Sequence, residues 1–180
     1  MYFKLLFIGF CLLNIQTDVA TITWSEDYNL TWSDFKGPIE TASDAVAITA
    51  SGISFGYAIK SENKEVSGFK TKILAHFYPE KSWYKAALAD EHILAHEQFH
   101  FNITELYARK FRERVARLQP STDVSFQLEA LHKEINRELA AKQIQYDAET
   151  DFSRDFEQQA IWEKYIEQEL AKLATYKSEE

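Results

Sequence analysis

The pentapeptide His-Glu-Gln-Phe-His at residues 96–100 constrains this chain more than any other feature. It lies inside the apolar run 93–101, which contains no proline and no charged residue except Glu97. On an α-helix, residues four apart lie about 40° apart around the axis and roughly 6 Å apart along it. His96 and His100 can therefore direct both imidazoles at one point, provided that this run forms a helix.

Two imidazoles at this spacing can share a divalent metal ion. Zn²⁺ lies about 2.0–2.1 Å from a histidine nitrogen, and an H-E-x-x-H helix supplies two such ligands and a glutamate base. Glu97 lies about 100° further around the helix, where it can reach water near the metal without sharing the position of the histidines. The same pattern occurs on solvated helices without a metal, but an apolar flank favours the metal because buried imidazoles need a polar partner.

A catalytic zinc usually has three protein ligands and one open position, so a third ligand must come from elsewhere. His92 precedes His96 by one turn, but it lies about 12 Å along the axis from His100, too far for one ion. Glu105 points about 140° away from His100, and an i, i+4 pair with Arg109 is its expected role.

The remaining candidates for a third ligand lie near the expected second helix. They are His132 and the acidic residues Asp147, Glu149 and Asp151. Acidic residues at the end of a helix are commonly solvated. The residue pattern alone therefore leaves the third ligand open.

The first 20 residues indicate a cleavable signal peptide. Lys4 supplies a positive charge, and residues 5–13 form an apolar run that is too short to span a bilayer. Cleavage is expected near Ala20, although Asp18 fits the preceding small-residue position poorly; a buried first strand is the alternative. We expect a secreted or periplasmic protein with a single domain over residues 21–180.

Composition excludes several classes of protein. A hydrophobic content of 46% and an aromatic content of 14% are typical of a globular protein. The net charge of -8 and the absence of a basic run argue against nucleic acid as a partner. The only cysteine, Cys11, falls in the signal segment, so a metal must be held by histidine and carboxylate. After signal removal, no stretch is suited to crossing a membrane.

Strand periodicity occupies the first part of the chain. Short β-like pieces are expected at 22–24 and 30–32, followed by an alternating strand at 45–59 and another at 69–77. The last two are natural partners in an antiparallel hairpin. A shift in the alternation near Gly52 predicts a bulge or bend there.

Helical periodicity follows. A helix is expected from about Ser82 to Pro120, a second from about 123 to 146, and a third capped by Ser153. Strands first and helices after predict an α+β fold, in which an N-terminal antiparallel β-sheet precedes the H-E-x-x-H helix and two further long helices.

Three segments resemble one known family. Residues 96–109 resemble the signature helix of domain of unknown function 922, a family of secreted bacterial proteins predicted to be zinc-dependent proteases. Residues 30–37, LTWSDFKG, resemble its LTWxDFxG motif, and residues 146–150, YDAET, resemble its YDxxT motif. This resemblance spans nearly the whole mature chain. It implies a zincin-like fold, an export signal, His96 and His100 as zinc ligands and Glu97 as the general base.

The chain departs from this family at two positions. Phe99 stands where the family usually has Gly, and Phe152 stands where a His commonly follows YDxxT. If that His is the family's third ligand, this chain has lost it; if the Asp is, Asp147 is retained. We take Asp147 as the third ligand.

These observations predict an exported zinc metallopeptidase that acts on a peptide or protein substrate. An extended substrate would pair with a sheet edge formed by residues 45–78. Phe152 motivates an alternative, a catalytically inactive zincin-fold binding or scaffold protein of the periplasm or cell envelope. A third interpretation, a helical interaction module without metal, follows from the Glu- and Gln-rich helices between 125 and 176.

Overall fold

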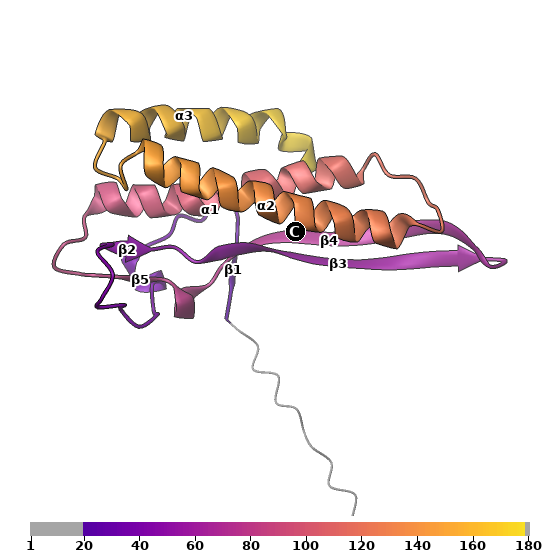
Figure 1. The fold of residues 1–180 in the computed structure, drawn as a ribbon, viewed down its shortest axis with the longest axis horizontal. Coiled ribbons are helices and arrows are strands. Elements are labelled where there is room, and N and C mark those ends of the chain that lie inside the picture. Colours follow the sequence, from indigo (N-terminus) through magenta and orange to yellow (C-terminus); the bar gives the residue numbers. More distant parts are fainter. Residues whose placement is uncertain (1–19, 179–180) are drawn as a thin grey trace, which may run out of the picture.

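A computed structural model describes residues 20–178 of the chain. The predicted signal peptide, residues 1–20, therefore lies outside the described residues except for its last position. Within these residues five strands come first and three long helices follow, with three short 3-10 helices between and after them. The α+β prediction is confirmed, and the helices lie together on one side of the sheet (Figure 1). None of the helices within residues 20–178 combines the length and the apolar character that crossing a membrane needs.

A long antiparallel hairpin forms most of the sheet. β3 (Ser51–Glu62) pairs with β4 (Glu65–Phe77), which confirms the predicted hairpin. The two residues of its turn, Asn63 and Lys64, have φ of 51° and 70°, and positive φ at both positions is typical of the type I′ loop that fits the twist of paired strands. β1 (Ile22–Thr23) pairs with the end of β4, so β3 lies at an edge of the sheet, in the order β1-β4-β3.

The segment predicted as one strand over 45–59 is divided between two sheets. β2 (Ala47–Ile48) pairs with β5 (Trp83–Tyr84) in a separate two-stranded sheet. Of the bulge or bend predicted near Gly52, the bulge was wrong, because the β3–β4 register is continuous there and shifts only between Lys60 and Ser61. The altered alternation instead marks the place where the chain leaves one sheet for the other.

The predicted strand at 30–32 was also wrong. Trp32–Asp34 forms a 3-10 helix, η1. The Asp34 carboxylate accepts hydrogen bonds from the Thr31 backbone N–H at 2.7 Å and from the Thr31 hydroxyl at 2.9 Å. Such local bonds offer the backbone an alternative to strand pairing.

This N-terminal segment docks onto the helices and the connection before them. The Leu30 N–H donates to the side-chain oxygen of Gln98 at 2.7 Å. Gly37 donates to the Ser82 carbonyl at 2.7 Å, and a Cβ at this position would lie 2.9 Å from the same oxygen. Glycine is thus the residue that permits this approach.

α1 (Glu91–Val115) begins later than predicted. The Asp90 side chain caps it by accepting from the Ile93 N–H at 2.9 Å. The preceding segment is held extended, because the Ser82 hydroxyl accepts from the Ala50 N–H at 2.9 Å and β5 follows at once. The helical start predicted near Ser82 is therefore wrong by about two turns.

α1 is the central helix of the fold. α2 (Val124–Glu149) and α3 (Phe156–Lys172) pack on α1, which in turn packs on β3 and β4 (Figure 1). Asp155, not the predicted Ser153, caps α3 by accepting from Gln158 N–H. The core lies between the sheet and the three helices and includes Ile73, Phe77, Phe101, Ile103, Leu106, Phe111, Leu128, Ile135 and Ile166.

Candidate metal centre

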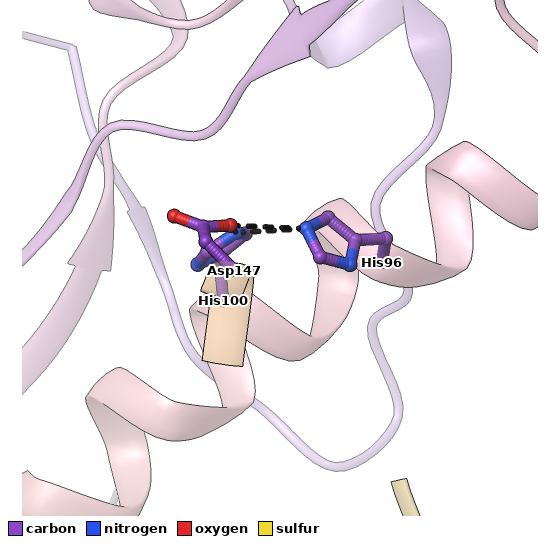
Figure 2. A group of neighbouring side chains, drawn as sticks. All are labelled: His96, His100 and Asp147. Carbon is purple, nitrogen blue, oxygen red and sulfur yellow. Dashed lines mark hydrogen bonds and ion pairs between the residues drawn. The ribbon is translucent and has the colours of Figure 1, made fainter. Parts of the chain in front are cut away.

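Two helices bring together the side chains of His96, His100 and Asp147. The histidines lie on α1, and Asp147 lies in the last turn of α2. Asp147 Oδ1 lies 3.2 Å from His96 Nε2 and 2.9 Å from His100 Nε2, and the two Nε2 atoms are 3.2 Å apart. Figure 2 shows the three groups pointing toward one another. Over residues 20–178, no other group of three or more such side chains is close enough to share a metal ion.

The spacing of these three atoms can be compared with that of zinc ligands. Around a tetrahedral ion with bonds of about 2.0–2.1 Å, neighbouring ligand atoms lie about 3.3 Å apart. The observed separations are 2.9–3.2 Å. Two imidazole nitrogens and one carboxylate oxygen are also a donor set found at catalytic zinc sites. The residues present therefore fit a zinc ion in both geometry and chemistry.

The pKa shifts in this group show that it favours a positive charge on the imidazole side. Burial raises the pKa of Asp147, but hydrogen bonds with His100 and His96 outweigh burial and hold that pKa well below its usual range. Burial lowers the pKa of His100, but the hydrogen bond with Asp147 and the negative charges of Glu97 and Asp147 leave it raised. A divalent metal ion bound by the same atoms would compete with a proton for this position.

The YDAET segment builds the α2 side of the group. The Tyr146 ring stacks on His96, with centroids 4.5 Å apart and 16° between planes, and meets His100 edge-on. The Thr150 hydroxyl donates to the Tyr146 carbonyl at 2.8 Å, which satisfies one of the free carbonyls at the helix end. Tyr146 therefore orients the imidazole, Asp147 supplies the carboxylate, and Thr150 ends the helix.

Glu97 lies beside the three candidate ligands but not among them. Its residue is 4% exposed, and within the described part of the chain its Oε2 atom has no hydrogen-bond partner. Its charge contributes to the raised pKa of His100, which shows that it is close to that ring. A buried carboxylate oxygen without a partner is costly, and a catalytic role is one reason for a protein to retain it.

The other histidines considered from the sequence lie elsewhere. The His92 ring stacks on Phe156 with centroids 3.7 Å apart, and its Nε2 donates to the Ser153 carbonyl at 2.7 Å. His132 packs against the rings of Phe55 and Phe111. Neither joins the group of three.

The acidic alternatives also have other partners. Glu149 accepts from the Trp162 indole N–H at 2.9 Å, and Asp151 pairs with the Arg154 guanidinium at 2.7 Å. Glu105 accepts from Arg109 Nε at 2.9 Å, as expected for an i, i+4 pair. Asp147 is thus the acidic candidate that reaches the two imidazoles, whereas its role as a metal ligand stays a prediction.

The turn after α2 is strained. Asp151, Phe152 and Ser153 have φ of 47°, 54° and 70°, a left-handed conformation that is costly for residues other than glycine. The Phe152 N–H donates to the Asp147 carbonyl at 2.8 Å, and the Phe152 side chain is 63% exposed. Phe152 therefore holds the backbone of Asp147, while its ring takes no part in the group.

Gln143 was missed by sequence reasoning. Its Oε1 lies 2.5 Å from His100 Nδ1. The signal that could have found it is its spacing, because Gln143 lies four residues before Asp147 and therefore on the same face of α2.

The fold and this site define an α+β protein that carries two histidines and a carboxylate on facing helices. The family described as "Bacterial protein of unknown function (DUF922)" matches residues 31–157, which is more than half of the chain. The chain therefore belongs to that bacterial family, as its motifs suggested. The matched region contains all three residues of the group and Glu97. Neither a curated protein nor a solved structure matches the chain.

Proposed function

We propose that this protein is an exported zinc-dependent metallopeptidase of the zincin-like type that hydrolyses amide bonds in peptide or protein substrates. The observation that carries the proposal is the convergence of His96 Nε2, His100 Nε2 and Asp147 Oδ1 within 3.2 Å of one another. The buried carboxylate of Glu97 beside them adds the base that such chemistry needs.

His96, His100 and Asp147 would hold the zinc. When bound, zinc supplies a Lewis acid that polarises a carbonyl and makes water more acidic. Glu97 accepts the proton of the attacking water and returns it to the leaving amine, which is the role of a general base and then of a general acid. Its unpartnered Oε2 is available for this transfer. The low exposure of the two imidazoles, 5% for the His96 side chain and 12% for that of His100, strengthens these electrostatic interactions.

The edge strand offers a way to hold an extended substrate. β3 has a partner on one side only in the three-stranded sheet, so its free edge can pair with the backbone of a peptide. The chain leading into β3 lies close to Glu97, because the Thr49 hydroxyl donates to the Glu97 carbonyl at 3.2 Å. A substrate paired along this edge would run toward the catalytic carboxylate.

Glu97→Gln tests the proposal directly. The mature protein, loaded with zinc, is incubated with an unfolded protein substrate, and cleavage is followed by mass spectrometry together with metal content. We expect a loss of at least about 100-fold in rate, since a general base typically contributes that much, with zinc content unchanged. Glu91→Gln, an exposed position in the first turn of α1, is the matched control and should retain full activity.

The outcomes separate the candidate functions. Equal cleavage by the wild type and Glu97→Gln would show that Glu97 is not the base. Zinc binding without any cleavage would support the alternative, an inactive zincin-fold binding or scaffold protein. A wild-type protein that binds no zinc would contradict both and leave a helical interaction module.

A further inference from the structure

We propose that Gln143 is a positioning residue that fixes His100 in the tautomer whose Nε2 is free to bind a metal ion. The inference rests on the proposed zinc site, but it assigns a role to a residue that is not itself a ligand. Gln143 lies on α2 one helical turn before Asp147, so the same helix face supplies both the carboxylate and the group that orients its partner imidazole.

The neighbours of Gln143 determine the orientation of its amide. Gln143 Nε2 lies 2.9 Å from the backbone carbonyl oxygen of His100 and 3.2 Å from Thr104 Oγ1. A carbonyl oxygen can only accept, so the amide atom that faces it must be the NH₂ group. The reversed amide would place two acceptor oxygens against each other.

This orientation decides where the proton of His100 lies. Gln143 Oε1 faces His100 Nδ1 at 2.5 Å, and an amide oxygen also can only accept. The Nδ1 atom must therefore carry the hydrogen. A neutral imidazole with its hydrogen on Nδ1 has its lone pair on Nε2, the atom that lies 2.9 Å from Asp147 Oδ1 and 3.2 Å from His96 Nε2.

Thr104 and Ser51 complete the network. The Thr104 hydroxyl donates its single hydrogen to the His100 carbonyl at 3.1 Å and accepts from Gln143 Nε2. Ser51 Oγ lies 2.7 Å from Thr104 Oγ1, and it must be the donor because the hydrogen of Thr104 is already used. Thr104 is fully buried, and both its lone pairs and its hydrogen have partners, so the network has little freedom to rearrange.

The two imidazoles differ in this respect. His96 Nδ1 is buried and has no partner among the residues that the structure describes, whereas His100 Nδ1 is held by Gln143. A hydrogen-bond partner of a metal-bound histidine typically contributes tenfold to 100-fold to metal affinity. Loss of Gln143 should therefore weaken zinc binding without removing a ligand.

Three variants test this inference. Gln143→Met keeps the length of the side chain and removes the acceptor, and Gln143→Glu restores an acceptor for His100 Nδ1. Gln145→Met is the matched control, because Gln145 lies on the same helix and is exposed, and its side chain hydrogen-bonds, among residues 20–178, to Lys142 and Glu149. Zinc affinity is measured by competition with a chromophoric chelator, and the imidazole N–H of the zinc-loaded protein is assigned by ¹⁵N NMR.

We expect Gln143→Met to lower zinc affinity tenfold to 100-fold, Gln143→Glu to recover part of that loss, and Gln145→Met to bind as the wild type does. In the zinc-loaded wild type the proton should be on His100 Nδ1. Wild-type affinity in Gln143→Met would overturn the inference. A proton on His100 Nε2 in the zinc-loaded wild type would overturn it as well, and that measurement does not depend on whether Gln143→Met folds. A wild type that binds no zinc would instead overturn the proposed function on which this inference rests.

Discussion

The two halves of α1 each bury charged or titratable side chains, but in opposite ways. The C-terminal half buries Glu105 and Arg109, each 1% exposed, whereas the N-terminal half buries His96 and Glu97, each 4% exposed. Both pairs lie on one helix within the same core. The difference between them is how completely their hydrogen-bonding groups are satisfied.

The C-terminal pair is fully engaged in holding the fold together. Arg109 donates to Glu105 at 2.9 Å and to the Leu170 carbonyl at 2.7 Å, and Arg112 donates to Glu105 at 3.0 Å and to the Ile73 carbonyl at 2.8 Å. These bonds connect α1 with α3 and β4. Such a network stabilises the packing, and none of the side-chain atoms of Glu105, Arg109 or Arg112 is buried without a partner in the described part of the chain.

In the N-terminal half of α1, some buried polar atoms lack hydrogen-bond partners among the described residues. His96 Nδ1 and Glu97 Oε2 are buried without partners in the described part of the chain, and two imidazoles converge on one carboxylate. Buried polar groups without partners cost stability, and the proposed zinc chemistry would use the groups in this half. Other buried atoms of the described residues, such as His132 Nε2 and Gln159 Oε1, also lack partners, so the comparison teaches that unsatisfied burial supports a site only where possible metal ligands also converge, as His96, His100 and Asp147 do.

The largest expected change in stability comes from removing one partner of the buried Glu105–Arg109 pair. Arg109→Met should lower the free energy of unfolding by up to about 3–5 kcal/mol, because it leaves the buried Glu105 carboxylate with Arg112 as its remaining partner and the Leu170 carbonyl without Arg109. Urea denaturation measures this, with zinc bound per folded molecule unchanged. Arg117→Met removes an exposed i, i+4 pair with Glu113 and should cost no more than about 0.5 kcal/mol. Similar costs for both variants would contradict the distinction.

A smaller change in stability is expected when zinc binds to His96, His100 and Asp147. Zinc at about 100 times its dissociation constant should stabilise the folded protein by about 2.7 kcal/mol, because the ligand binds the folded state only. Asp147→Ala should abolish most of this stabilisation while leaving the satisfied half of α1 intact. Thermal unfolding with and without zinc provides the measurement. An Asp147→Ala protein that zinc stabilises as much as the wild type would show that Asp147 is not a ligand.

The smallest expected effect is a difference in pH dependence. The Asp147 hydrogen bond and the Glu97 charge outweigh burial and raise the pKa of His100 above 6.5. In the metal-free protein this contributes stability that is fully present below pH 6.5 and is lost as pH rises through the raised value. Zinc must displace that proton, so zinc affinity should instead increase with pH, by up to about tenfold per unit for one proton.

Unfolding measured from pH 6 to 9 checks these opposite slopes. His76 also contributes to the pH dependence. Burial lowers its pKa in the folded protein, so its contribution to stability rises with pH. Asp147→Asn removes the Asp147 charge, keeps the Glu97 charge and leaves His76 unchanged. The difference between wild type and Asp147→Asn thus isolates the part of the pH dependence that comes from the pairing of Asp147 with the imidazoles, and a difference without pH dependence would refute that part.

Local sequence patterns predicted much of the fold, but they were wrong where contacts with other residues determined the secondary structure. The β3–β4 hairpin followed from alternation, and the apolar stripe of α1 from its spacing. Residues 30–32 have strand-like composition, yet the Asp34 carboxylate bonds to Thr31 and turns the chain into a 3-10 helix. The segment after Ser82 was predicted as helix, yet pairing with β2 makes it a strand.

The sequence by itself determined the two-histidine pair and the position of Glu97, because spacing within one helix is fixed by 3.6 residues per turn. Only the tertiary structure decided which acidic residue faces that pair. Asp147 and Glu149 point in different directions around α2, Asp151 lies beyond its end, and the packing of α2 on α1 determines which of them reaches the imidazoles. It also decided that Gln143 holds His100. The physical reason is that contacts between helices depend on the packing of all the side chains in the core, which no single segment specifies.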